Sequence, residues 1–131
     1  MSTATSKAAA LRTGLYADPA GIFVHDAILD ACRLYGEKTA LIEGDRRISF
    51  ARYGEMVESV ARSLVTAGIA PGDRIAIFLP NSWEFAVAYH ATTLADAIPT
   101  PLNPSYKERE VRYQVENSGA KFLISDGVQV G

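Results

Sequence analysis

Apolar and polar positions along the chain follow two periods, one typical of helices and one typical of strands. Between Ser49 and Gly68 the apolar positions recur at helical spacing and fall on one face. This stripe consists of Tyr53, Met56, Val57, Val60, Ala61, Leu64 and Val65. Ser49 predicts an N-cap and Gly68 predicts the end of the helix. A similar stripe over residues 24–36, ending at Gly36, predicts a second amphipathic helix.

Short β-prone segments alternate with these helices. Thr39–Glu43 and Arg46–Phe50 flank Gly44–Asp45 and predict a β-hairpin. Arg74–Leu79 is apolar at every position after the first, which is typical of a strand covered on both faces.

Two further strands are expected at residues 97–102 and 121–125. Pro99 and Pro101 each lack a backbone N–H, so we expect the first of these strands to be short or irregular. The strand–helix–strand order indicates right-handed crossovers and a parallel sheet. The predicted fold class is therefore α/β, a partial doubly wound parallel sheet with flanking helices and an N-terminal β-hairpin.

Two helices connect the three strands. Residues 81–95 are apolar almost all round, which predicts a buried helix that starts at Asn81 or Ser82. With Asn81 as N-cap, Glu84 would complete a capping box. We expect it to bury Phe85, Ala86, Tyr89 and Leu94. Residues 108–118, ending at Gly119, predict a solvated helix with pairs such as Arg112–Glu116.

Composition excludes several classes of function. The 131 residues are 48% hydrophobic with a formal net charge of −2, which suits one globular unit and gives no basic surface for nucleic acid. A single cysteine, Cys32, excludes an internal disulfide framework and favours a cytoplasmic location. No apolar run approaches the ~20 residues that span a bilayer. Residues 1–20 are expected to form a disordered leader before one unit over residues 21–131.

Candidate binding residues follow the predicted strands, because ligands of open α/β sheets bind beyond the carboxyl ends of the strands. These segments are Pro80–Ser82, Leu102–Tyr106 and Asp126–Gly127. Helix capping also explains Asn81 and Asn103. His25, His90 and Cys32 show no catalytic spacing, and we expect structural roles for them. We assign no catalytic residue and no metal ligand to this chain.

Several motifs in a fixed order carry a family resemblance. They are Ile48–Tyr53, Gly68–Ile77, Pro80–Phe85, Pro101–Pro104, Asn103–Glu110 and Asn117–Lys121. Together they resemble the N-terminal portion of the AMP-forming acyl-CoA synthetases of the adenylate-forming superfamily. The segment after Asn103 looks most like fatty-acid-activating and 4-coumarate-CoA ligases.

The resemblance implies a ligase whose full-length form uses ATP, Mg²⁺ and CoA. A carboxylic acid attacks ATP to give an acyl-adenylate and pyrophosphate, and CoA then displaces AMP. The family's Ser/Thr/Gly-rich phosphate loop ending in Lys-Gly and its later motifs do not occur in these 131 residues. We therefore expect the chain alone to be inactive, to bind no cofactor by itself, and to need the remainder of a synthetase as its partner.

Similarity to the acetyl-CoA synthetase branch implies CoA-side candidates at Asn103, Ser105, Tyr106 and Gln129. Two positions depart from the family pattern. Lys107 replaces a capping Thr, so Ser105 is expected to cap the following helix, and Asp96 replaces a Gly at a turn that Asp can adopt.

The alternative class is a free-standing α/β binding or interaction module. Self-association through an uncovered apolar surface is expected for a fragment.

Overall fold

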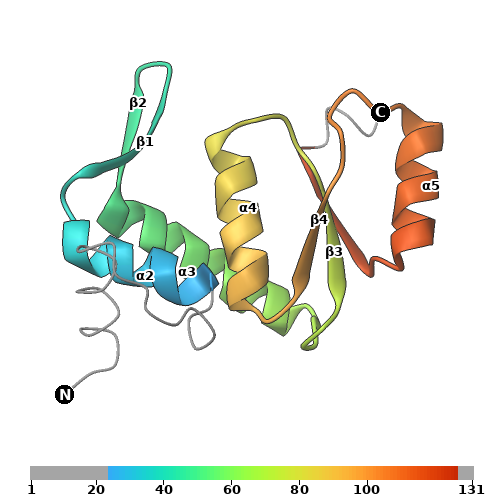
Figure 1. Cartoon of the computed structure of the whole chain (residues 1–131), viewed down its shortest axis with the longest axis horizontal. Coiled ribbons are helices and arrows are strands. Elements are labelled where there is room, and N and C mark those ends of the chain that lie inside the picture. Colours follow the sequence, from blue (N-terminus) through green and yellow to red (C-terminus); the bar gives the residue numbers. More distant parts are fainter. Residues whose placement is uncertain (1–23, 127–131) are drawn as a thin grey trace, which may run out of the picture. The chain divides into compact units, whose positions relative to one another are not determined.

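The computed structural model describes residues 24–126 (Figure 1). Its elements are α2 (Val24–Tyr35), β1 (Thr39–Glu43), β2 (Arg46–Ser49), α3 (Phe50–Thr66), β3 (Arg74–Phe78), α4 (Trp83–Leu94), β4 (Ile98–Pro101), α5 (Glu108–Ser118) and β5 (Phe122–Ser125). Each matches a predicted element in type and in place. The expected leader over residues 1–20 and the candidate Gln129 lie outside the described residues.

The chain divides into two compact units, residues 1–56 and 57–131, with α3 crossing the boundary. In the first unit β1 and β2 form an antiparallel hairpin, whose turn places Gly44 at a φ of 59°. The amide of Arg52 donates to Ser49 Oγ at 3.1 Å, which confirms the predicted cap of α3. A Cβ on Gly54 would lie 3.0 Å from the Cβ of Cys32, so glycine permits close packing around the buried Cys32.

The second unit contains a three-stranded parallel sheet in the order β4–β3–β5. Helix α4 covers one face and α5 covers the other (Figure 1). This arrangement confirms the predicted α/β fold with flanking helices. Side chains alternate along the central strand as the strand period requires. Ala76 and Phe78 pack on the α5 side, whereas Ile77 and Leu79 pack on the α4 side.

The predicted burial of α4 is wrong in detail. The buried residues of α4 are Val87, Ala88, Ala91 and Thr92. The four residues that we expected to be buried, Phe85, Ala86, Tyr89 and Leu94, are half-buried. A helix that is apolar all round has no stripe that marks its inner face, so the packing partner decides it. In α3 the stripe is confirmed except at Val65, which is 56% exposed.

The prolines of β4 do not make the strand irregular. Ile98 donates to Asp73 O at 2.7 Å and Leu102 donates to Ile77 O at 2.9 Å, so the amides that face β3 belong to alternate residues. Pro99 and Pro101 occupy the positions between them, whose amides would point away from β3. The missing donors therefore lie on the outer side of an edge strand, where they break no bond within the sheet.

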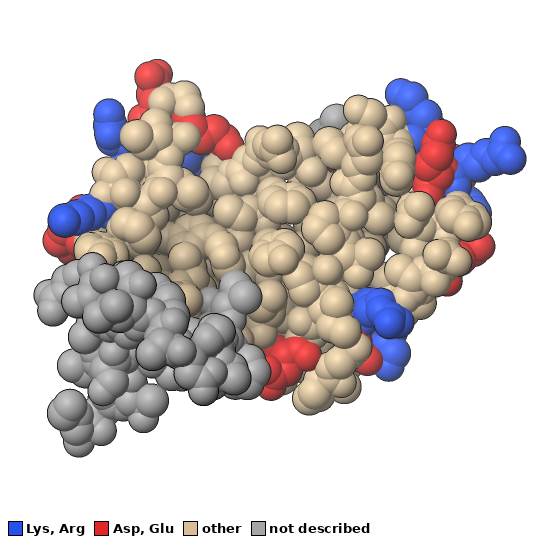
Figure 2. All heavy atoms as spheres, in the orientation of Figure 1, with Lys and Arg blue, Asp and Glu red and all other residues tan. Residues whose placement is uncertain are grey.

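Charged side chains of both signs lie over α5 and near the loops that flank it (Figure 2). The Arg112 side chain pairs with Glu108 at 2.8 Å, so the predicted Arg112–Glu116 pair is wrong. Both pairs have the same spacing on a helix, and the N-terminal acid places the negative charge nearer the positive end of the helix dipole.

Within residues 24–126, no helix combines the length and apolar character needed to cross a membrane.

Candidate functional site at the carboxyl end of the sheet

The three strands are parallel, so the loops that follow them leave from the same end of the sheet. We call this the carboxyl end. The first loop, residues 79–82, leads into α4, and the second, residues 102–107, leads into α5. Ser125 ends β5, and Asp126 is the one described residue that follows this strand. The predicted segments are thus brought to one end of the sheet, where open α/β folds bind ligands.

Ser82, not Asn81, caps α4. The Ser82 backbone is extended, with φ −163°, and its Oγ accepts a hydrogen bond from the amide of Phe85 at 3.2 Å. The same hydroxyl donates to Pro80 O at 2.9 Å. Both residues are good N-caps, so the sequence does not discriminate between them. Asn81 is exposed, and its amide is not used to cap the helix.

The loop after β4 is organised by Asn103. Its Oδ1 accepts from the amide of Ser105 at 2.9 Å, and its carbonyl accepts from the amide of Tyr106 at 3.0 Å. This is an Asx turn, so the prediction that Asn103 caps a helix is wrong. The hydrogen bonds fix the loop while the Asn103 and Ser105 residues remain exposed. Tyr106 is half-buried against the cluster around Phe78.

Lys107, not Ser105, occupies the N-cap of α5, so that prediction is also wrong. The amide of Lys107 donates to Glu110 Oε2 at 2.9 Å. A lysine ammonium has no acceptor atom, so its side chain cannot complete a capping box. Glu110, three residues on, therefore supplies the cap through its carboxylate.

A cavity of about 310 Å³ lies at the same end of the sheet, on the α4 side. Its lining consists of Val60, Leu79, Trp83, Glu84, Val87, Ala88, Ile124, Ser125 and Asp126. Most of the wall is apolar, and Glu84 and Asp126 contribute carboxylates. Such a lining suits an apolar group and disfavours phosphate. The one sequence signal near this cavity is the large aromatic residue Trp83 at the start of α4.

The opposite, amino end of the sheet is held by side chains from distant segments. Asp73 Oδ2 accepts from the amide of Ala70 at 2.8 Å, and Lys121 Nζ lies 3.1 Å from Asp73 Oδ1. These two contacts, the backbone bond first, lower the pKa of Asp73. Arg74 Nη1 also donates to Ser118 O at 3.1 Å. Asp96, near this end, has φ 61°, which confirms the predicted turn at this residue.

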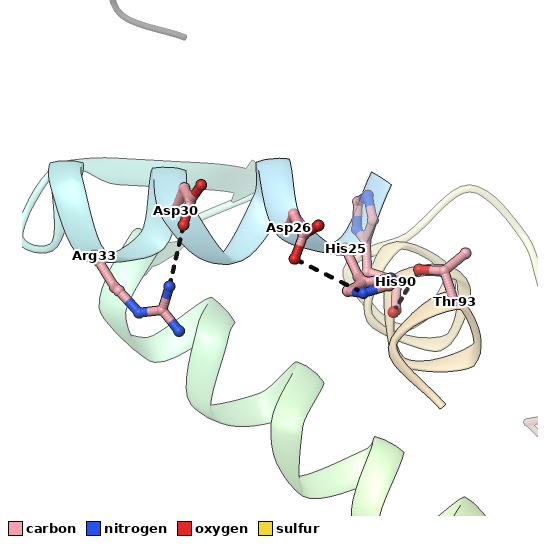
Figure 3. A network of polar contacts seen from close by, with 6 residues as sticks. All are labelled: His25, Asp26, Asp30, Arg33, His90 and Thr93. Atoms are coloured by element: carbon pink, nitrogen blue, oxygen red, sulfur yellow. Dashed lines mark hydrogen bonds and ion pairs between the residues drawn. The ribbon is translucent and has the colours of Figure 1, made fainter. Parts of the chain in front are cut away.

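The two histidines lie on different helices, His25 in α2 and His90 in α4. His25 Nε2 lies 3.9 Å from Asp26 Oδ1, so this histidine has a carboxylate neighbour that the sequence reasoning missed (Figure 3). On the same helix Arg33 pairs with the buried Asp30 at 3.1 Å (Figure 3). Burial lowers the pKa of His90 and favours the neutral ring.

Residues 24–126 contain no group of three or more side chains suited to hold a metal ion. Among the described residues of the three loops, Lys107 is the one cation. This set does not fit a magnesium–triphosphate group, which needs several cationic or backbone donors around its oxygens. Asn103, Ser105 and Tyr106 offer neutral amide and hydroxyl groups in the loop after β4.

Comparison with known proteins identifies the family. Residues 28–130 match the AMP-binding enzyme family. The chain is 36% identical over 95 residues to a 3-[(3aS,4S,7aS)-7a-methyl-1,5-dioxo-octahydro-1H-inden-4-yl]propanoyl:CoA ligase of Mycobacterium tuberculosis, covering 72% of this chain and 19% of the relative. It is 32% identical over 102 residues to triostin synthetase I of Streptomyces triostinicus, covering 77% of this chain and 19% of the relative.

Solved structures agree with the sequence comparison. The N-terminal subdomain of NpsA from Klebsiella oxytoca, in complex with anthranilyl-AMSN, superposes with a TM-score of 0.74 at 28% identity. The match covers 82% of this chain and 28% of that one. The chain spans about a fifth of the length of the curated relatives that it matches. It therefore belongs to the AMP-binding enzyme family, the adenylate-forming ligases, and corresponds to the N-terminal portion of its members.

Proposed function

We propose that the chain is the first part of an AMP-forming acid–CoA ligase. The full enzyme would join a carboxylic acid to the α-phosphate of ATP, releasing pyrophosphate, and the CoA thiol would then displace AMP from the acyl-adenylate. The observation that carries this proposal is the family match over residues 28–130, on a parallel sheet whose loops gather at one end. Residues 21–131 would form the subdomain, and residues 1–20 a leader.

Within that enzyme the described residues would bind and position rather than react. Asn103 and Ser105 are exposed on a loop that their own hydrogen bond holds in shape. A preformed loop loses less conformational entropy when a ligand binds. We place Asn103, Ser105 and Tyr106, together with Gln129, on the CoA side of the site.

The cavity beside Trp83 would complement that role. Its apolar lining and its two carboxylates favour an uncharged, apolar group over a phosphate. ATP and Mg²⁺ would depend on residues outside these 131, because the chain has no phosphate loop. The chain alone would therefore bind ATP and Mg²⁺ weakly and would not turn over ATP.

An exchange assay tests the proposal. The purified chain is incubated with Mg-ATP, labelled pyrophosphate and a panel of aliphatic and aromatic acids. The matched sample is a chimera in which this chain replaces the corresponding part of the Mycobacterium tuberculosis ligase. We expect no exchange from the chain alone and exchange from the chimera. Exchange by the chain alone would contradict the expected inactivity, and a folded but inert chimera would contradict the ligase assignment.

The alternative is a free-standing α/β module that binds a ligand or a protein without catalysis. It is distinguished by the same chimera, since a module with a separate role need not support adenylation in a ligase framework. Exchange by the chimera therefore favours the ligase part, and its loss in a well-folded chimera favours the module.

A further inference from the structure

The α4-side cavity at the carboxyl end of the sheet separates its apolar lining from its charged lining. Leu79, Val87 and Ala88 are buried and form the floor. Glu84 and Asp126 also line the cavity, but both residues are exposed, so their carboxylates stand where it opens to solvent. All of this lining belongs to the second compact unit. A ligand that fills the cavity therefore meets apolar groups inside and two negative charges at the mouth.

The mouth of the α4-side cavity is net negative. Its described lining includes no Lys, Arg or His. The positive end of the α4 dipole lies at this mouth, because Trp83 begins the helix and Glu84 stands in its first turn. That helix end is equivalent to roughly half an elementary charge, against the two full charges of Glu84 and Asp126. The mouth therefore attracts a cation and repels a carboxylate or a phosphate.

A second hollow, on the other face of the sheet, has a different charge pattern. This groove of about 400 Å³ runs beside α5, and Leu123 within it is 39% exposed. Its lining includes Arg112 as well as Glu108, and the two side chains pair at 2.8 Å. A cation already belongs to that lining, whereas the described lining of the α4-side cavity has none. A preference for cationic ligands is thus expected of the α4-side cavity in particular.

The size of the α4-side cavity limits the ligand to a small amphiphile. Its volume of about 310 Å³ lies at the lower end of the ~300–1,000 Å³ range of ligand pockets. It therefore suits a short alkyl chain or one ring system rather than a nucleotide. Trp83 is half-buried in its wall, and an indole ring packs on alkyl groups and attracts ammonium groups at its face. Shape and charge thus favour the same kind of molecule.

We propose that the α4-side cavity binds an amphipathic amine, a small molecule with a short alkyl or aromatic tail and a protonated amino group. The tail displaces water from the buried floor, which is favourable in proportion to the apolar area covered. The ammonium stays at the mouth beside the carboxylates of Glu84 and Asp126. This site goes beyond the ligase reaction, which uses a carboxylic acid, ATP and CoA, and its test needs no activity.

Fluorescence tests the proposal directly, because Trp83 is the single tryptophan of the chain and lines the cavity. The 131-residue chain is titrated at low ionic strength with octylammonium, octanol and octanoate, which share one tail and differ in the charge of the head group. We expect saturable binding in that order of affinity, with a step of at least about threefold in Kd at each change of head group. Added salt should compress these steps, because it screens exposed charges. Butylammonium should bind at least about tenfold more weakly than octylammonium, because its tail buries fewer methylene groups.

Charge-removing variants locate the effect at the mouth. Glu84→Gln combined with Asp126→Asn removes both charges while nearly preserving the shapes of the side chains. It should raise the Kd of octylammonium to that of octanol and leave the Kd of octanol unchanged. Glu116→Gln, an exposed acid of α5 outside the described lining, is the matched control and should preserve the order and the steps. All three positions are exposed, so each variant is expected to fold.

Four results would overturn the proposal. The absence of saturable binding would show that the cavity takes no such ligand. Octanoate that binds as tightly as octylammonium would show that the mouth does not select by charge. An equal loss of octylammonium affinity in Glu116→Gln would reduce the effect to the net charge of the chain. A Trp83 signal that changes with protein concentration and prevents amine binding would assign the cavity to a second copy of this chain.

Discussion

The two ends of the parallel sheet are built by different means. At the amino end, side chains bridge segments far apart in sequence, as Asp73 does with Lys121 and Arg74 with Ser118 O. At the carboxyl end, the hydrogen bonds of Ser82 and Asn103 reach only two or three residues along the chain. The amino end thus fixes how the strands are placed, whereas the carboxyl end shapes its loops locally and leaves polar groups exposed. A binding surface can then vary without disturbing the sheet.

The largest expected effect comes from the core that joins the two ends. Phe78 is 1% exposed at the end of β3, so Phe78→Ala should cost about 3–5 kcal/mol of unfolding free energy by leaving a cavity. Phe85 is only half-buried on α4, so Phe85→Ala should cost clearly less. Urea unfolding of both variants gives the two values. An equal loss would show that α4 depends on Phe85 as a core residue.

The amino end should make stability depend on pH. The folded-state pKa of Asp73 is lowered, so its contribution is present above the unfolded value of about 3.9 and is lost as pH falls through the folded value. Asp73→Ala should therefore lower Tm at pH 7 and flatten the fall of Tm between about pH 5 and 2. Lys121→Ala should have the smaller effect, since the bond from the Ala70 amide remains. A steep acid transition that survives in Asp73→Ala would place its origin elsewhere.

At the carboxyl end, adjacent residues provide a matched test of capping. Ser82→Ala removes the acceptor for the Phe85 amide and should cost about 1 kcal/mol of unfolding free energy. Asn81→Ala removes an exposed side chain that caps nothing and should leave the unfolding free energy almost unchanged. The reverse order would restore Asn81 as the cap that the sequence predicts.

The smallest effect on stability should accompany an effect on binding. Asn103→Ala breaks a turn that is exposed and local, so the unfolding free energy should change by no more than about 0.5 kcal/mol. In the ligase chimera the same change should raise KM for CoA while KM for ATP stays constant. Tyr113→Ala, on the exposed side of α5, serves as the control. Unchanged CoA kinetics would remove Asn103 from the CoA side.

The sequence predicted the elements well because their signals are local. The stripe of α3, the fully apolar β3 and the Gly119 end of α5 each follow from spacing or from one residue's backbone preference. Capping was less predictable. Ser82 and Asn81 are equivalent as sequence, and the choice between them depends on which backbone is extended at the turn.

The candidate site was predictable in place but not in shape. Parallel strands bring their carboxyl ends together, so the loops around Asn81, Asn103 and Asp126 could be grouped before the structure was known. The cavity lined by Trp83 and Ile124 could not be predicted from the sequence, because it depends on how side chains of α3, α4 and β5 leave space between them. The bond between Asp73 and Lys121 likewise joins two loops that only the sheet brings together.

The sequence by itself determined the order of helices and strands, the parallel α/β class and the family, because periodicity and short motifs are properties of neighbouring residues. The tertiary structure alone decided which face of α4 is buried, that the prolines of β4 point outward, and that the α5 side of β5 stays open. Those features depend on which surfaces meet across long sequence separations, and a helix or strand does not encode its partner in its own pattern.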